Sequence, residues 1–480
     1  MHLEANLCRA PQSYEDFLTK CTSSSSCSLL AVRETKDSLC STVNMSRGLA
    51  KCLVSTAGKL EAAGTLCGSF KSAPRFRFLL SSAKAPAMSL SSAPYISPPE
   101  CLFHPLDFPM KTLMGPGPSN APPRVLAAGA LPLLGHLHPE FTQIMDQVKQ
   151  GIQYAFQTQN EWTFAISGSG HAAMEAVVAN LLEPGEVAMV CTNGLWGVRF
   201  ADMVDRNGAV AEVLKRPMGE VFTLQEIEEG LKKYKPVLVF VTHGESSAGT
   251  AQPLEGIGSL CHKYNSMLVV DSVAALGGVP LFMDKWEIDC LYSGSQKVLG
   301  APPGTAPISY GERARKKIAS RSSRVRSYYF DATELANYWG CDSGPRRYHH
   351  TGFISSVYAL REGLASLAEV GLEQSWANHK QCAEQLHEGI EKLGLELLVK
   401  DKIYRNPCVT CIKVPDGIQW KDVCDYAMKN YRVEIAGGLG ELAGKVWRIG
   451  IMGYNCNPDK VRLVLRAFSE GLASVGYKAP

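Results

Sequence analysis

The 480-residue sequence predicts an α/β fold, with a large domain built on a mostly parallel sheet covered by helices and a smaller α+β domain at the C-terminus. Three observations predict this architecture. Short apolar runs alternate with helical patterns between residues 138 and 292. The runs are apolar nearly throughout, which is typical of parallel strands buried on both faces. After about residue 355, long helical stretches and shorter strand candidates replace the alternation.

The elements of the large domain follow in order. Phe141, Met145, Val148 and Ile152 recur at helical spacing and predict a helix over 138–157. Strands are expected at 163–166, 187–191, 236–241, 267–270 and 289–292. Helices are expected at 171–182, 195–206, 223–234 and 254–264. Such alternation of strand and helix favours a parallel sheet with helices on both faces.

The C-terminal part has a different order and length of predicted elements. A helical stretch over 353–393 is broken near Gly371. Strand candidates follow at 408–414 and 445–451, and helices at 420–430 and 458–474. We therefore assign the large domain to 111–370 and the small domain to 371–480.

The N-terminal extension, residues 1–88, differs in composition from the rest. Its second half, 45–88, is rich in Ser and Ala and carries seven basic residues against the single acid Glu61. The basic residues are Arg47, Lys51, Lys59, Lys71, Arg75, Arg77 and Lys84. A basic, serine-rich and acid-poor segment is typical of a mitochondrial transit peptide, which normally begins a chain, so we expect initiation at Met45. The Pro-rich residues 89–110 are expected to form an extended arm.

These features predict a location in the mitochondrial matrix. The chain ends in Tyr-Lys-Ala-Pro at 477–480, which does not resemble a peroxisomal Ser-Lys-Leu signal. A shorter form starting near Met88 would lack the leader, so a peroxisomal product is the alternative.

Composition argues against several classes of function. Lys plus Arg number 49 and Asp plus Glu 46, and this net charge of +3 gives no reason to expect a nucleic-acid or membrane-surface binder. No uncharged apolar run reaches the roughly 18 residues of a membrane span. The 16 cysteines are scattered, which fits buried thiols in a reducing compartment rather than a disulfide scaffold.

Three motifs each follow a strand candidate. Ser-Gly-Ser-Gly-His at 167–171 opens a helix, where free backbone N–H groups suit a phosphate. Asp271 ends the strand at 267–270, and Lys297 follows the strand at 289–292 on a Gly/Ser-rich turn. Ligands of open α/β sheets bind at the carboxyl ends of strands, so the three are expected to share a site. Pyridoxal phosphate needs a phosphate cup, a carboxylate for its ring nitrogen and an amine for its aldehyde.

From about residue 95 to about 475 the chain resembles fold-type I pyridoxal-phosphate enzymes of aminotransferase class V, most narrowly the alanine–glyoxylate (serine–pyruvate) aminotransferases. The motifs that carry the resemblance are LMGPGPSN at 113–120, SGSGH at 167–171, THGESS at 242–247, VDSV at 270–273, YSGSQK at 292–297, YHHT at 348–351 and WRIG at 447–450.

The resemblance implies roles for particular residues. Lys297 would carry the internal aldimine of a ping-pong mechanism, and Asp271 would bind the pyridinium N–H; these two would be catalytic. Trp196 would stack on the ring, and Arg448 would hold the substrate carboxylate. The other residues expected to contact the cofactor are Ser169, Gly170, His171, Ser246, Gln296, Tyr348 and Thr351. The last two would reach the phosphate in the neighbouring subunit, which implies a homodimer.

The implied reaction is transamination of a small amino acid, alanine or serine, with glyoxylate or pyruvate. Alanine and glyoxylate would give pyruvate and glycine, a detoxification of glyoxylate. The alternative is another class V enzyme, such as a broader-specificity aminotransferase or a cysteine desulfurase-like enzyme.

Rival classes match less well. Residues 440–445 approach a Walker motif, but Leu439 replaces its first glycine and Val446 its Ser or Thr. The Gly-Glu-Ser-Ser-Ala sequence at 244–248 misses the last glycine of a hydrolase nucleophile motif. Cys408 and Cys411 have C-x-x-C spacing without a second pair, so we expect no metal site.

Overall fold

The computed structural model describes residues 96–480. Its contacts separate residues 1–103 from residues 104–480. Of the first unit, the described part includes the short 3-10 helix η1 (Glu100–Phe103). The predicted extension 1–88 with its targeting segment, and the start of the predicted arm at 89–110, lie outside the described residues. The rest of this account concerns the unit 104–480.

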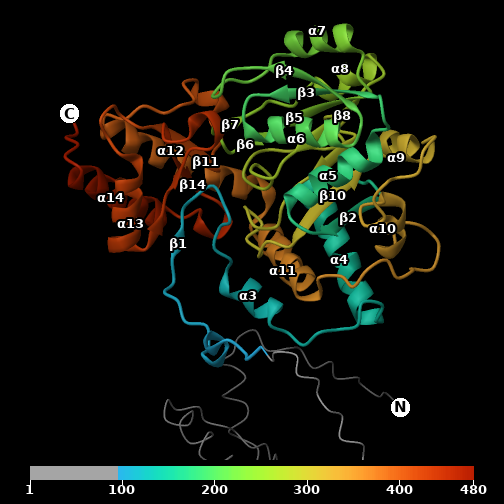
Figure 1. Cartoon of the computed structure of the whole chain (residues 1–480), viewed down its shortest axis with the longest axis horizontal. Helices are drawn as coiled ribbons and strands as arrows, with labels where there is room; N and C mark the ends of the chain where they lie inside the picture. The colour runs from blue at the N-terminus through green and yellow to red at the C-terminus, as the bar shows by residue number, and fades with distance from the viewer. Residues whose placement is uncertain (1–95) are drawn as a thin grey trace, which may run out of the picture. The chain divides into compact units, whose positions relative to one another are not determined.

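A seven-stranded sheet forms the centre of this unit (Figure 1). Its strands lie in the order β2 (Trp162–Ser167), β10 (Thr305–Tyr310), β9 (Cys290–Tyr292), β8 (Met267–Asp271), β5 (Leu238–Thr242), β3 (Val187–Thr192) and β4 (Val210–Lys215). The run from β9 to β4 is parallel throughout, and β10 is antiparallel to both of its neighbours. The predicted α/β class with a mostly parallel sheet is confirmed.

Two strands of this sheet were missed by the sequence prediction, each for a physical reason. β4 is an edge strand whose side chains are partly or fully exposed, so it lacks a continuous apolar run. β10 lies inside the sheet but contains Pro307, a residue that cannot donate a ladder hydrogen bond and so argues against a central strand. The sheet accommodates it because the Pro307 carbonyl still accepts a hydrogen bond from the Ser293 N–H at 2.9 Å.

Helices cover both faces of the sheet. In Figure 1 the strands β4, β3, β5 and β8 lie between α7 and α8 above and α5 and α6 below. The helices of this part are α3 (Pro123–Gly129), α4 (Pro139–Phe156), α5 (Gly170–Leu181), α6 (Leu195–Arg206), α7 (Leu224–Tyr234), α8 (Ile257–Lys263), α9 (Glu312–Ala319) and α10 (Ala332–Tyr338). Helix α7 begins at a reciprocal capping box between Thr223 and Glu226, which satisfies two of its free N–H donors.

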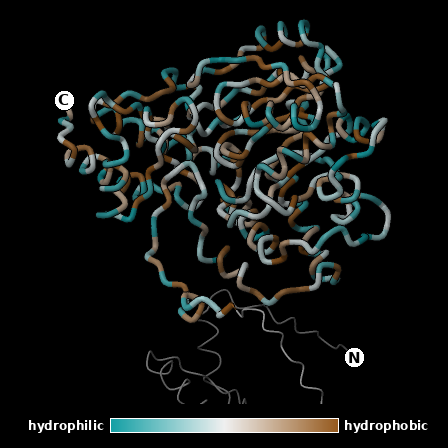
Figure 2. The backbone as a smooth tube through the Cα atoms, viewed as in Figure 1, coloured by the Kyte–Doolittle hydropathy of each residue, from teal (hydrophilic) through white to brown (hydrophobic). Residues whose placement is uncertain are grey.

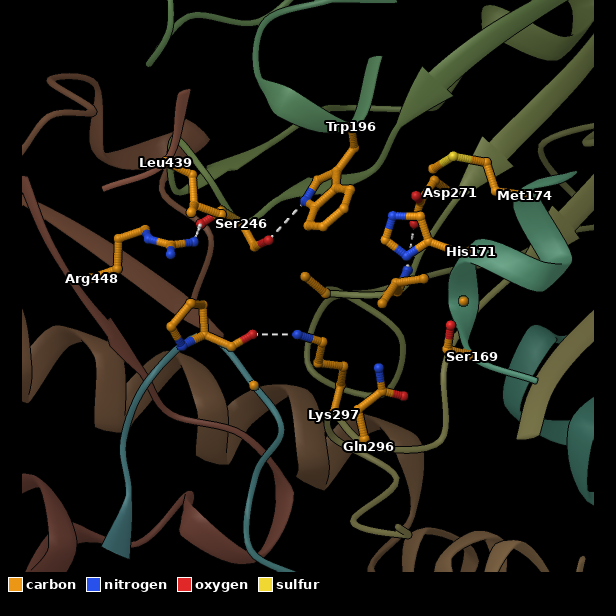
Figure 3. Close-up of a pocket in the computed structure, with 16 residues that line it drawn as sticks. Ser169, His171, Met174, Trp196, Ser246, Asp271, Gln296, Lys297, Leu439 and Arg448 are labelled. Atoms are coloured by element: carbon orange, nitrogen blue, oxygen red, sulfur yellow. Dashed lines mark hydrogen bonds between the residues drawn. The ribbon is translucent and has the colours of Figure 1, made fainter. Parts of the chain in front are cut away.

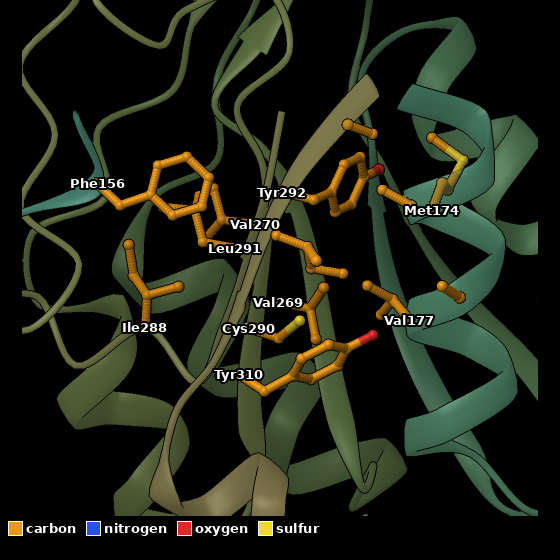
Figure 4. Packing of buried hydrophobic residues seen from close by; sticks show 14 of the residues in the cluster. Phe156, Met174, Val177, Val269, Val270, Ile288, Cys290, Leu291, Tyr292 and Tyr310 are labelled. Carbon is orange, nitrogen blue, oxygen red and sulfur yellow. The ribbon is translucent and has the colours of Figure 1, made fainter. Parts of the chain in front are cut away.

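The side chains of the central strands point alternately to the two faces of the sheet, and both faces are buried. Figure 4 shows Leu291 of β9 beside Phe156, while the next residue, Tyr292, points toward Met174 of α5. All four side chains are almost completely buried. Because the side chains of a strand alternate between faces, a strand covered on both sides must be apolar at every position. The same core excludes water from the strand ends where the site is built.

Helix α11 (Ile354–Val370) packs into the core around the central sheet through residues such as Leu360 and Leu364. The elements after α11 enclose a second hydrophobic core that includes Leu386, Trp447 and Phe468. In order they are α12 (Leu372–Lys392), η2 (Lys402–Tyr404), β11 (Val409–Lys413), α13 (Trp420–Tyr431), β12 (Val433–Glu434), β13 (Ala436–Gly437), η3 (Gly440–Leu442), β14 (Val446–Gly450), η4 (Gly453–Asn455) and α14 (Pro458–Ser474). Strands β11, β14 and β13 form an antiparallel sheet. The predicted domain boundary at residue 370 stays a prediction.

Short pairings link segments that are distant in sequence. β1 (Thr112–Leu113) pairs in parallel with β12, and Met114 packs into the second core. β6 (Gly244–Glu245) and β7 (Thr250–Ala251) form a small hairpin. Figure 2 shows hydrophobic stretches along the central strands and hydrophilic positions on the outer turns of the helices. Among the helices of residues 96–480, none combines the length and apolar character needed to cross a membrane.

Candidate active site

A cavity of about 260 Å³ opens where the carboxyl ends of the central strands meet the C-terminal elements (Figure 3). Nine of the residues predicted from the sequence line it. They are Ser169, Gly170, His171, Trp196, Ser246, Asp271, Gln296, Lys297 and Arg448. The structure therefore brings these residues together, while the individual roles expected for them stay predictions.

Asp271 is the last residue of β8 and its side chain is buried. Its two carboxylate oxygens accept hydrogen bonds of 2.8 Å from the Val273 N–H and from the Tyr292 hydroxyl. Burial raises the pKa of Asp271 to about 6, against the lowering effect of these bonds and of Lys297. A fixed, dry carboxylate of this kind is suited to pair with a cation that enters the cavity.

Lys297 follows β9 and its amine donates a hydrogen bond to the Pro116 carbonyl. Desolvation by burial, together with the nearby Arg448 charge, lowers the pKa of Lys297 to about 8. Gly117 permits this packing, because a Cβ at Gly117 would come within 2.2 Å of the Lys297 amine. The site thus holds a lysine that loses its proton more easily than an exposed one, as a nucleophilic amine must.

The start of α5 forms the third part of the site. Ser169 is the N-cap residue, and no side chain caps the helix. The first N–H groups of Gly170 and His171 therefore face the cavity end of the helix, where an anion is favoured. Gln296 lines the same region with its buried side-chain oxygen unpaired. Figure 3 shows Ser169 and Gln296 on the same side of the cavity.

Trp196 forms one wall of the cavity and is fixed by its indole N–H. This group donates to the Ser246 hydroxyl at 2.8 Å, as the dashed line in Figure 3 shows. The His171 ring meets the indole edge to face, with centroids 5.5 Å apart. Burial lowers the pKa of His171, which favours a neutral imidazole beside the indole.

Arg448 comes from β14 and reaches the cavity from the opposite side. Its Nε donates to the Gly437 carbonyl at 2.8 Å and one terminal nitrogen donates to the Ser246 carbonyl at 3.2 Å. The side chain is almost fully buried. These bonds orient the guanidinium and leave further N–H donors for a carboxylate in the cavity.

Tyr348 and Thr351 do not line the cavity. Both are exposed, and their side-chain oxygens lie 3.3 Å apart on the segment that precedes α11. Their predicted role concerns a second subunit and stays a prediction. Cys408 and Cys411 are free and buried, and within residues 96–480 no cluster of His, Cys, Asp and Glu is suited to a metal ion.

The sequence prediction missed several residues of the site. Met174 and Leu439 line the cavity, and Glu245 lies buried behind Trp196. Met174 and Leu439 carry no chemical signature in a sequence, since apolar residues line cores as often as pockets. Glu245 had a usable signal: it is an acid within a stretch without other charges, between an apolar strand and a Gly-containing turn.

The chain is similar to proteins of one known family. Residues 113–459 match the model of the family described as aminotransferase class-V. The alanine–glyoxylate aminotransferase of Callithrix jacchus is 54% identical over 377 residues, which cover 78% of this chain and 91% of the relative. A solved alanine–glyoxylate aminotransferase from Nostoc sp. has a TM-score of 0.76 and 43% identity, covering 78% of this chain and 100% of that chain. A ureidoglycine–glyoxylate aminotransferase from Bacillus subtilis has a TM-score of 0.76 and 37% identity, covering 78% and 96%.

These similarities do not favour the cysteine desulfurase-like alternative. None of the described residues that line the cavity is a cysteine.

Proposed function

Because the chain belongs to the class-V aminotransferase family, we propose that it transfers the amino group of alanine to glyoxylate, giving pyruvate and glycine, with pyridoxal 5′-phosphate as cofactor. The substrates follow the names of relatives such as the enzyme of Callithrix jacchus. One observation carries the proposal: a buried carboxylate, a lysine of lowered pKa, an uncapped helix start and a buried arginine line a single cavity.

The residues of the cavity fit this cofactor. Asp271 would pair with its ring nitrogen, Lys297 would meet its aldehyde, and the N–H groups at the start of α5 would receive its phosphate. The unpaired oxygen of Gln296 needs a donor, which a bound molecule can provide. Gly117 leaves room for the Lys297 amine, since a Cβ at Gly117 would lie 2.2 Å from it.

Pyridoxal 5′-phosphate, when bound, supplies a conjugated ring that accepts the electron pair left when substrate Cα loses its proton. Asp271, as an anion, keeps the ring nitrogen protonated and so favours that transfer of charge. Lys297 would take the Cα proton on its amine and return it to the cofactor carbon that carries the aldehyde. Arg448 holds the substrate carboxylate by parallel hydrogen bonds and thereby directs the Cα proton toward Lys297.

The lining of the cavity favours small substrates. Among the described residues that line it, the basic side chains are Lys297, Arg448 and His171, and burial lowers the pKa of the histidine. Because Lys297 is assigned to the cofactor and Arg448 to the α-carboxylate, no further permanent cation of the described lining is left for the distal carboxylate of glutamate or 2-oxoglutarate. Burying such a carboxylate without a partner is costly, and Leu439 and Met174 offer it only apolar contact.

The test is a panel of donors and acceptors on the purified protein, with bound cofactor measured separately by its absorbance after release in alkali. We expect alanine to exceed glutamate in kcat/KM with glyoxylate by about a hundredfold or more, since an unpaired buried charge costs several kcal/mol. Serine and pyruvate form further arms of the panel. Equal values for alanine and glutamate would contradict the small-substrate proposal, and absence of bound cofactor would contradict the whole function.

We further propose that the working form is a homodimer in which Tyr348 and Thr351 reach the phosphate of the neighbouring site. The exposure of Tyr348, at 53%, supports this because an aromatic side chain gains from being covered. The basic composition of residues 45–88 likewise supports our proposal of a mitochondrial matrix location.

A further inference from the structure

Glu245 is a buried acid that the proposed reaction does not use. It lies on β6, immediately before Ser246, and none of its surface is exposed. Burial raises the pKa of Glu245 to about 7, while hydrogen bonds from Ser247 and from the Trp196 N–H oppose that rise. A carboxylate in such a place is costly unless its oxygens are fully used.

Both oxygens of Glu245 are indeed used, and they connect two segments of the site. Oε2 accepts the Trp196 N–H at 3.1 Å, and Oε1 accepts the N–H and the hydroxyl of Ser247 at 2.8 and 2.6 Å. The Ser247 hydroxyl in turn accepts the Leu195 N–H at 3.0 Å. Glu245 and Ser247 together therefore satisfy the first two N–H groups of α6.

The N-cap residue of α6 provides no side-chain cap. The N-cap residue is Gly194, which has no side chain, and helices with free N–H donors favour a negative charge at this end. A Cβ on Gly194 would lie 2.2 Å from the Glu245 carboxyl carbon, so the glycine makes room for the acid. The cap is supplied from 50 residues away in the chain, and it ties α6 to β6.

We propose that Glu245 is a positioning residue that sets the orientation of the Trp196 indole in the cavity. Trp196 is fixed at two points: its backbone N–H donates to Glu245, and its indole N–H donates to the hydroxyl of the next residue, Ser246. Because Glu245 and Ser246 are adjacent in the chain, the backbone and the indole ring of Trp196 are held by neighbouring residues of the same segment. The inference rests on the proposed function only in taking the cofactor ring as the group on which the indole stacks.

The decisive experiment is a double-mutant cycle of Glu245→Gln and Trp196→Phe. Glutamine has the same shape, but in either orientation of its amide one N–H donor faces a backbone N–H donor. We expect E245Q to weaken binding of pyridoxal 5′-phosphate, measured by equilibrium dialysis, by about tenfold. In the W196F background the same change should alter binding by less than about twofold, because no indole remains to be displaced.

A second readout does not need the cofactor. The near-ultraviolet circular dichroism of cofactor-free wild type minus that of W196F isolates the signal of this indole, and E245Q should reduce it. Ser247→Ala, which removes one link of the cap, should act in the same direction and keeps the test open if E245Q fails to fold. Glu312→Gln, an exposed acid on α9, is the matched control, and Ile227→Val in the core controls for lost stability.

The outcomes distinguish the positioning role of Glu245 from the proposed function. An equal loss of affinity in both backgrounds, or an unchanged indole signal in E245Q and S247A, would overturn the positioning role. If the wild type does not bind the cofactor at all, the proposed function fails, and the dichroism comparison still decides the role of Glu245.

Discussion

Replacing Asp271 with asparagine separates chemistry from folding. The change removes one negative charge and keeps the shape. The asparagine oxygen can still accept from the Val273 N–H. The asparagine amide can donate to the Tyr292 hydroxyl, which reverses the direction of the second bond but keeps it. The perturbation is therefore confined to the charge that faces the cavity.

The effect on stability follows from the pKa of the aspartate. In the cofactor-free protein its pKa is raised from 3.8 to about 6, so the folded state resists ionisation. This group lowers stability as the pH rises through that interval, and above it the loss is on the order of 3 kcal/mol. Asparagine does not ionise, so cofactor-free D271N should unfold at the same temperature as wild type or higher at pH 8.

The effect on rate should be large and opposite. A buried charge pair that loses one partner costs about 3 kcal/mol or more, which corresponds to roughly a hundredfold in rate. The assay is kcat for alanine with glyoxylate, corrected for bound cofactor, with Asp459→Asn on the exposed start of α14 as control. A fall of less than threefold, or a collapse of the unfolding temperature, would identify Asp271 as a structural cap and refute this reasoning.

Three further predictions concern the lysine and the leader. Lys297→Ala should abolish transamination while the unfolding temperature changes little, and borohydride reduction of wild type with cofactor should label Lys297; an adduct on another lysine would disprove the assignment. Because the pKa of Lys297 is lowered to about 8, the amine is mostly deprotonated above that pH, so the rate of this labelling should rise with pH with a midpoint near 8 and level off at higher pH. A midpoint near 10.5, as for an exposed lysine, would contradict the burial argument. A fusion of residues 45–110 to a reporter should enter mitochondria, and a cytosolic signal would count against the transit peptide.

The sequence alone predicted several local elements of the fold, although it missed strands β4 and β10. The predicted helix at 195–206 is α6, and the predicted helix at 458–474 is α14. Each has an apolar face of helical period, and such a pattern needs no knowledge of distant residues. The three motifs at strand ends also meet in one cavity, as a parallel sheet requires, because its strands share one carboxyl edge.

Only the tertiary structure decided how the remaining parts of the site assemble. Pro307 lies in an interior strand because its carbonyl is still paired, a fact that no local pattern contains. Arg448 and Leu439 reach the cavity through the packing of the second core, more than 140 residues after Lys297. Glu245 caps a helix that begins 50 residues earlier. Propensity and periodicity act over a few residues. Burial and hydrogen bonding act between all surfaces that the folded chain brings into contact. The positions of Arg448, Leu439 and Glu245 depend on these long-range contacts.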